Sequence, residues 1–422
     1  MKPRILVASI CLLFFAGSAS ADSLNCRLVG SWSSASCYLV VIDSARKLAF
    51  CATSVRMYTL DVSDPTRAVL LSDTLVTNDA VNGLWYSTGR LYIAAGSVGL
   101  EIWDVSTPAS PVLLGQISLS SPALDVVVAG DHAYVARADI AADSGAGLSV
   151  VDVSNPGQPR EVGHCVLPAF PYGVSVQDSY AYASLVDVWP HRYSGLSVVK
   201  VSSPQTPTEI GRCATPGWGY GVNTAGNYAY VADYGYGLRV IDVSNRESLK
   251  EVGNWDDTSG FAYGVATTGN YVHVADYGLG LRVIDVSNPQ KPREVGHYAT
   301  PGSACKVAAS GGYDYVADES GLEIIQFYGA GVEEGKRLPA QCSRLTATVV
   351  RGVLTMPLTA NRLPLTASLL DISGRKVMTV HSGANDVSHL APGVYFVWSA
   401  TTPSLPAMSE TWHSTYKVIT TK

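Results

Sequence analysis

Aromatic and acidic side chains are the groups of this 422-residue chain that are best suited to bind or convert a ligand. They gather where β-forming stretches end in glycine-rich loops. An aromatic ring stacks on a sugar or an apolar side chain, and a neighbouring carboxylate adds hydrogen bonds that orient the ligand. On this basis the candidate ligand-binding residues are Asp187, Trp189, His191, Trp218, Asp233, Tyr236 and Asp276.

Catalytic patterns are weaker. Carboxylates that meet at the mouth of a central channel could act as acid and base, so an extracellular hydrolase or lyase remains the alternative function. No Ser-His-Asp set has local support. Residues 217–221 are glycine-rich like a phosphate loop, but they lead into a strand rather than a helix. Asp139 and Asp143 could hold calcium, yet no EF-hand pattern is present, so we expect no metal and no cofactor.

These side chains lie at the ends of strands that belong to an internal repeat. The triplet Asp-Val-Ser recurs from Asp61 to Asp285, and degenerate copies begin at Lys200 and Gln326. Each of the seven copies contains stretches rich in Val, Ile and Tyr, separated by Gly, Asn and Pro. Four antiparallel strands in about 40–45 residues, repeated seven times, predict an all-β, seven-bladed β-propeller. The repeated aspartates at the turns are interpreted as structural, because their side chains bond local backbone.

Ring closure sharpens this prediction. The last copy offers only three strands, whereas residues 25–31 near the amino terminus resemble the fourth strand of other copies. We therefore predict that this N-terminal strand completes blade seven and removes its exposed sheet edge. An open β-solenoid is the alternative.

The segment 281–289, Leu-Arg-Val-Ile-Asp-Val-Ser-Asn-Pro, resembles the LVIVD repeat of bacterial and archaeal surface propellers. The resemblance extends over about residues 25–328. It implies the blade fold and carries no activity of its own.

Residues 1–21 read as a signal peptide. Two cations precede an apolar run of about a dozen residues, which is too short to span a bilayer, and Ala19-Ser20-Ala21 supplies a cleavage site. Elsewhere we expect no transmembrane segment. Residues 22–337 carry 20 Lys and Arg against 32 Asp and Glu. Such an acidic domain argues against nucleic-acid binding, which needs a cationic surface.

The C-terminal region follows another pattern. The domain boundaries predicted from the sequence are 22–328 for the propeller, 329–344 for a linker and 345–422 for a small β-sandwich. Its Gly-Arg-Lys, Pro-Gly-Val-Tyr and terminal Lys-Val-Ile elements resemble, in order, the type A sorting domain of the type IX secretion system. That resemblance implies export to the outer-membrane cell surface or beyond, with the secretion machinery as a partner. The insertion at 401–413 departs from the pattern, and a generic adhesive sandwich is the alternative.

Together these observations favour a secreted or cell-surface, non-catalytic propeller that binds a glycan or a protein. Export permits disulfides. The seven cysteines after residue 21 form an odd number, and Cys26 with Cys51 or Cys305 is the more plausible pairing. Spacing alone does not decide among them.

Overall fold

A computed structural model describes residues 23–139, 144–186, 193–256 and 259–329, together with the C-terminal strands within 348–420. The predicted signal peptide and linker lie outside the described residues, except for position 329. Among the described residues, no helix has the length and apolar character needed to cross a membrane.

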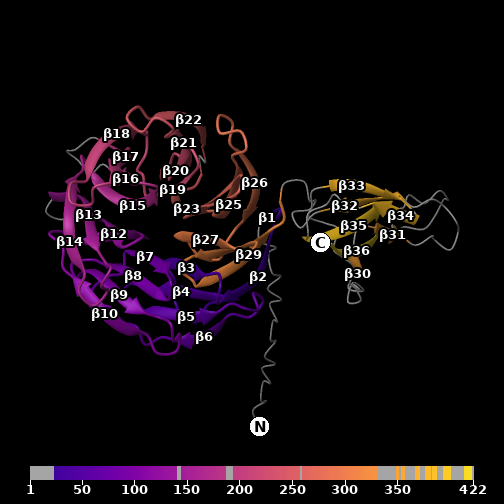
Figure 1. Cartoon of the computed structure of the whole chain (residues 1–422), viewed down its shortest axis with the longest axis horizontal. Helices are drawn as coiled ribbons and strands as arrows, with labels where there is room; N and C mark the ends of the chain where they lie inside the picture. The colour runs from indigo at the N-terminus through magenta and orange to yellow at the C-terminus, as the bar shows by residue number, and fades with distance from the viewer. Residues whose placement is uncertain are drawn as a thin grey trace, which may run out of the picture.

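Seven antiparallel sheets form a ring of blades, as Figure 1 shows, which confirms the predicted seven-bladed propeller. Blades one to three are β3 (Leu39–Asp43), β4 (Leu48–Ala52), β5 (Met57–Asp61) and β6 (Val69–Ser72); β7 (Gly83–Ser87), β8 (Arg90–Ala95), β9 (Gly99–Asp104) and β10 (Val112–Ile117); and β11 (Ala123–Ala129), β12 (His132–Asp139), β13 (Ser144–Asp152) and β14 (Arg160–Val166).

The next blades repeat this order. Blades four to six are β15 (Phe170–Gln177), β16 (Tyr180–Val186), β17 (Gly195–Lys200) and β18 (Thr208–Ala214); β19 (Gly221–Ala225), β20 (Tyr228–Ala232), β21 (Leu238–Asp242) and β22 (Lys250–Trp255); and β23 (Ala262–Thr268), β24 (Tyr271–Asp276), β25 (Gly280–Asp285) and β26 (Arg293–Tyr298). Blade seven contains β27 (Lys306–Ser310), β28 (Tyr313–Ala317) and β29 (Leu322–Phe327).

The hydrophobic core lies between blades rather than at one centre. The second and third strands carry apolar residues on both faces, because each blade is covered on both sides by its neighbours. Strand β4, for example, is buried at all five positions. Seven apolar clusters result, one at each interface around the ring. The fourth strands are more exposed and form the rim.

The N-terminal strand closes the ring, as predicted. Strand β2 (Cys26–Trp32) pairs antiparallel with β29, with Cys26 opposite Phe327 and Trp32 opposite Leu322. Its ends anchor in two different interfaces: Cys26 is buried between blades six and seven, and Trp32 between blades seven and one. Closure therefore uses both hydrogen bonds and side-chain burial.

A further strand was not foreseen from the sequence. Strand β1 (Ser23–Leu24) pairs with β26 and adds a fifth strand to blade six. Between β1 and β2, Asn25 has a φ of 52° and its Nδ2 donates to the carbonyl of Val295 at 2.6 Å. Asparagine tolerates this left-handed conformation better than most residues. The turn lets the chain leave blade six and enter blade seven.

Glycines in the fourth strands fit neighbouring blades together. At Gly253 of blade five a Cβ atom would lie 2.1 Å from the carbonyl oxygen of Pro289, in the Ser-Asn-Pro turn of blade six. The same relation joins Gly163 to Pro204 and Gly115 to Pro156. Each strand has a register shift beside its glycine. The glycine of one repeat thus accommodates the proline turn of the next.

The C-terminal strands form two sheets. The larger has the order β30 (Thr348–Val350), β36 (His413–Thr420), β35 (Gly393–Ala400), β32 (Thr366–Leu370) and β33 (Lys376–His381). The smaller pairs β31 (Val353–Met356) with β34 (Gly383–Asp386). The insertion at 401–412 lies outside the described residues. The small sandwich and the boundaries of the three segments stay predictions.

Candidate functional site

One face of the ring carries a continuous aromatic cluster. This face is formed by the turns between second and third strands and by the connections that enter the next blade. Rings from blades four, five and six touch one another there. We call the following set the aromatic face: Tyr172, Trp218, Tyr220, Tyr234, Tyr236, Phe261, Tyr263 and Tyr277.

Its outer layer is a stack of three rings. Trp218 stacks on Tyr234 with centroids 5.3 Å apart, and Tyr234 stacks on Phe261 at 4.5 Å. The central Tyr234 is held rigidly, because its backbone exchanges two hydrogen bonds with Ala262 of blade six. The outer rings stay accessible: Trp218 is 44% exposed and Phe261 is 39% exposed. The stack therefore presents preformed aromatic surface to solvent.

A second layer lies deeper. Tyr220 stacks on Tyr263 at 4.6 Å, Tyr172 meets Tyr220 edge-on, and Tyr277 packs on Tyr263. Burial, together with the neighbouring tyrosines, raises the pKa of Tyr263 to about 12, so its hydroxyl stays neutral. These half-buried tyrosines pack on one another across blades four, five and six. Aromatic pairs contribute about 0.5–1.5 kcal/mol each beyond their burial.

Asp233 supports the stack from beneath. Its carboxylate accepts hydrogen bonds from the Thr215 hydroxyl at 2.5 Å and from the Gly217 backbone N–H at 2.9 Å, and it lies 3.5 Å from the guanidinium of Arg239. Burial outweighs these partners and raises the pKa of Asp233 to about 6. The side chain is fully buried, so its role is to position the loop that carries Trp218.

Asp276 has the same place in blade six. Its carboxylate accepts from the backbone N–H groups of Phe261 and Gly278, and the side chain is fully buried. In blade seven Asp318 accepts in the same way from Gly302, Ser320 and Gly321. Each carboxylate joins the loop that enters its own blade to the turn that leaves its second strand. These three carboxylates are therefore engaged in holding loops.

The sequence candidates separate into three groups. Trp218 and Tyr236 lie on the aromatic face with 44% and 49% exposure, and the guanidinium of Arg239 lies 5.7 Å from the Tyr236 ring centroid. Asp233 and Asp276 lie below this surface. Asp187, Trp189 and His191 fall in 187–192, outside the described residues. Sequence reasoning missed the stacking roles of Tyr234, which directly follows the selected Asp233, and of Phe261.

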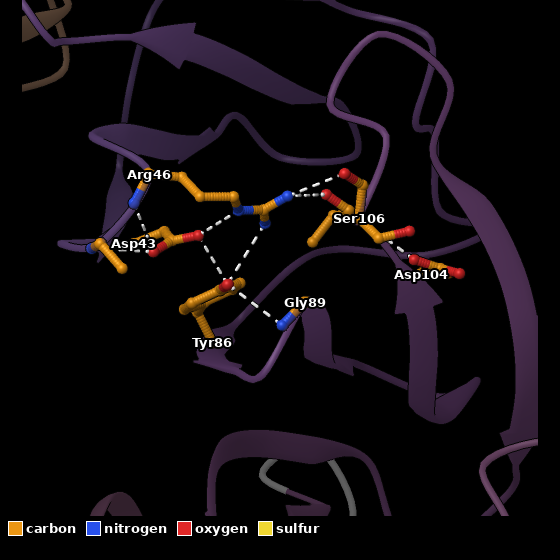
Figure 2. Close-up of polar contacts among 8 residues, drawn as sticks. Asp43, Arg46, Tyr86, Gly89, Asp104 and Ser106 are labelled. Carbon is orange, nitrogen blue, oxygen red and sulfur yellow. Dashed lines mark hydrogen bonds and ion pairs between the residues drawn. The ribbon is translucent and has the colours of Figure 1, made fainter.

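The opposite face carries a different polar network, drawn in Figure 2. The Tyr86 hydroxyl of blade two donates to Asp43 of blade one at 2.6 Å, and Arg46 donates to Asp43, to Tyr86 and to the carbonyls of Val105 and Ser106. Burial alone would raise the pKa of Asp43, but hydrogen bonds from Tyr86 and Arg46 outweigh it and lower that pKa. The network fastens blade one to blade two.

The repeated turn aspartates have the structural role expected of them. In Figure 2 the Ser106 backbone N–H donates to Asp104 at 2.8 Å, and the corresponding serine N–H groups donate to Asp152, Asp242 and Asp285. Each carboxylate thus closes the turn that follows its own strand.

In the part of the chain that the structure describes, no group of three or more His, Cys, Asp or Glu side chains is placed to hold a metal ion. Asp143 lies outside that part, and nothing is described of the Asp139 side chain.

Fold and site together define a seven-bladed β-propeller of repeated blades with an aromatic face on one side. The LVIVD repeat matches residues 80–118, 122–166, 172–215, 217–257, 259–300 and 301–326, more than half of the chain. The chain belongs to the LVIVD repeat family.

Solved structures confirm the architecture. The β-propeller domain of Cps50 (Swd1) from Myceliophteria thermophila is 11% identical to this chain with a TM-score of 0.58. The computationally designed protein Ika8 is 9% identical with a TM-score of 0.53. Each match covers 71% of this chain and 99% of the other, and at such low identity the likeness shows the fold alone. None of the curated proteins compared with the chain matches it.

Proposed function

We propose that this protein is a non-catalytic binding scaffold whose aromatic face takes up a glycan or an exposed segment of another protein. One observation carries the proposal: the stack of Trp218, Tyr234 and Phe261 leaves its two outer rings open to solvent. Monomeric proteins seldom expose several large rings together unless the surface is used.

The stack suits binding because it is already ordered. Tyr234 is fixed by backbone hydrogen bonds to the next blade, and Asp233 holds the loop of Trp218. A ligand therefore orders few side chains when it binds, which lowers the entropic cost. Stacked rings suit the apolar face of a sugar or an apolar side chain, and the half-exposed Asp256 and Glu319 offer hydrogen bonds nearby.

The described carboxylates favour this reading over the hydrolase or lyase. Asp233, Asp276 and Asp318 each bond to backbone within their own blade. A glycosidase needs one carboxylic acid and one carboxylate facing the same bond. Asp233, Asp276 and Asp318 are instead each engaged by the backbone of a loop.

Binding is tested with the full chain on arrays of glycans and of peptides. Trp218→Ala and Phe261→Ala each remove one outer ring of the stack. We expect each to weaken binding of any captured ligand about two- to tenfold, because stacking on an aromatic ring contributes about 0.5–1.5 kcal/mol. Trp85→Ala is the matched control. Trp85 is 36% exposed, close to the exposure of the two outer rings, but it belongs to blade two. Equal binding by all three variants would refute the proposal.

We also propose that the protein is exported to the cell surface or secreted. The support is the sequence of residues 1–21 and the resemblance of the C-terminal region to a type IX sorting domain. The machinery that reads this domain is then a partner. Expression in a bacterium with that system should give a product whose first residue is Asp22 and whose export depends on residues 345–422. Export without those residues would contradict the sorting role.

A further inference from the structure

Two buried cysteines lie together at the junction of blades seven and one, where the ring closes. Cys37 and Cys51 both have no exposed surface and pack in one apolar cluster. The Cys37 thiol donates to the carbonyl of Leu39 at 3.3 Å, and Cys51 is near enough to raise the pKa of the Cys37 thiol. Cys51 lies in β4, opposite Val40 of β3, and Cys37 comes just before β3. Both belong to the apolar cluster between blades seven and one, together with Trp32 and Leu322.

The position of Cys37 gives this contact a consequence. Residues 33–38 connect the closing strand β2 in blade seven to the first strand of blade one. The carbonyl of Cys37 accepts a hydrogen bond from the Glu319 N–H of blade seven at 2.9 Å, and the N–H of Tyr38 donates to Ala52 in blade one. A covalent link at Cys37 would therefore hold the exit of the closing strand to blade one.

We propose that Cys37 and Cys51 form a disulfide in the exported protein. Only the oxidising compartment in which the bond forms depends on the proposed export. The oxidant is a disulfide compound, such as an oxidised thiol-disulfide oxidoreductase or glutathione disulfide. One thiolate attacks that disulfide and releases the first thiol of the oxidant. The other cysteine then attacks the mixed disulfide, forms the S–S bond and releases the second thiol. The protein loses two protons and two electrons, and the oxidant gains them.

Burial determines when this reaction runs. Burial first, and then Cys51 and Asp318, raise the pKa of the Cys37 thiol well above its ordinary value. The thiolate is the reacting species, so the folded, reduced protein reacts slowly. The bond therefore forms while blade one is folding, before the seam closes over both thiols.

This pairing replaces those that the sequence made more plausible. Cys26 packs between blades six and seven, whereas Cys51 packs between blades seven and one. Cys305 comes just before β27, the innermost strand of blade seven, whereas Cys26 lies in β2, its outermost strand, with β28 and β29 between them. Spacing could not reveal this, because Cys37 reaches Cys51 only through the pairing of β3 with β4.

The test is refolding of the full chain from urea with glutathione disulfide, followed by alkylation and trypsin without reductant. Cleavage after Arg27, Arg46, Lys47 and Arg56 places the two cysteines on separate peptides, 28–46 and 48–56. We expect these peptides to be recovered as one linked species, about 2 Da lighter than their sum, and to separate after reduction. Cys51→Ser should abolish the linked species, whereas the matched control Cys213→Ser should keep it.

Stability gives the second measurement. The oxidised chain should melt several degrees higher than the reduced chain, and this difference should vanish in Cys51→Ser but remain in Cys213→Ser. If refolding yields no folded chain, the folded reduced protein is incubated with glutathione disulfide in mild urea, which opens the seam and exposes both thiols, and is then mapped in the same way. Recovery of 28–46 and 48–56 only as separate alkylated peptides would overturn the proposal. Because this experiment needs no export, its failure is distinct from a failure of the proposed localisation.

Discussion

The contact between fourth-strand glycines and proline turns predicts a specific stability loss. In Gly253→Ala the new Cβ atom would lie 2.1 Å from the Pro289 oxygen and 3.1 Å from the Gln290 Cα. Ordinary contact between carbon and oxygen requires more than 3 Å, so either the strand of blade five or the turn of blade six must move by about 1 Å. Both are backbone, and a rotamer change cannot relieve the overlap.

The magnitude follows from two opposing effects. Overpacking in a close-fitted interface costs about 1–3 kcal/mol. Replacing glycine by alanine also restricts the unfolded chain, which stabilises the fold by about 0.4–1 kcal/mol where the native φ permits it. The expected net loss is about 1–2 kcal/mol, or a drop in Tm of roughly 2–8 °C in a domain of this size.

The assay is thermal and urea unfolding of Gly253→Ala beside Gly278→Ala. Gly278 is the matched control, because its added Cβ would meet nothing within 4 Å and its φ is not in the left-handed region. The control should keep the stability of the parent chain or gain slightly. If Gly253→Ala is as stable as Gly278→Ala, the strand of blade five does not fit closely against the Pro289 turn of blade six.

Three further predictions concern the seams of the ring. Tyr86→Phe should lower the urea midpoint by an amount equivalent to about 1–2 kcal/mol at pH 7, because Asp43 and the Gly89 N–H lose their partner. Because the folded pKa of Asp43 is lowered, this difference should shrink as the pH falls below about 4. Burial, with the charge of Asp318, raises the pKa of Glu323 to about 7, so Glu323→Gln should raise Tm above pH 7 and change little at pH 4, where the parent glutamate is already protonated. A chain that starts at Ser33 lacks β1 and β2 and should aggregate in light scattering, whereas a chain that starts at Asn25 keeps β2 and should stay soluble.

The repeat made the ring predictable, since each blade shows the same alternation and the same turn residues. The missing fourth strand of blade seven and the unpaired strand predicted at 25–31 also indicated how the ring closes. The added strand β1 could not be foreseen, because two residues carry no periodicity. Contacts between repeats were also hidden: nothing local distinguishes Gly253 from a glycine in an open loop until Pro289 is placed above it.

The candidate site, too, was predictable from the sequence only in part. Residue type suggested the surface, and Trp218 and Tyr236 are exposed there. Residue type alone could not separate the exposed rings from the carboxylates beneath them, because Asp233 and Asp276 stand at the same strand ends as their aromatic neighbours. Burial decides their roles, and burial depends on the loop from the preceding blade that covers each carboxylate.

The two faces of the ring therefore differ for a physical reason. On one face the turns that follow the third strands fit over glycines of the preceding blade, as at Gly115, Gly163 and Gly253, so their shape is constrained there. On the other face a buried aspartate satisfies the loop backbone from within, in blades five to seven, and leaves the outward side chains free to vary. Aromatic residues can accumulate on that face without disturbing the blades. A binding surface can therefore form only where the side chains of the repeat are not needed to hold the blades together. Trp218, Tyr234 and Phe261 stack at such a place.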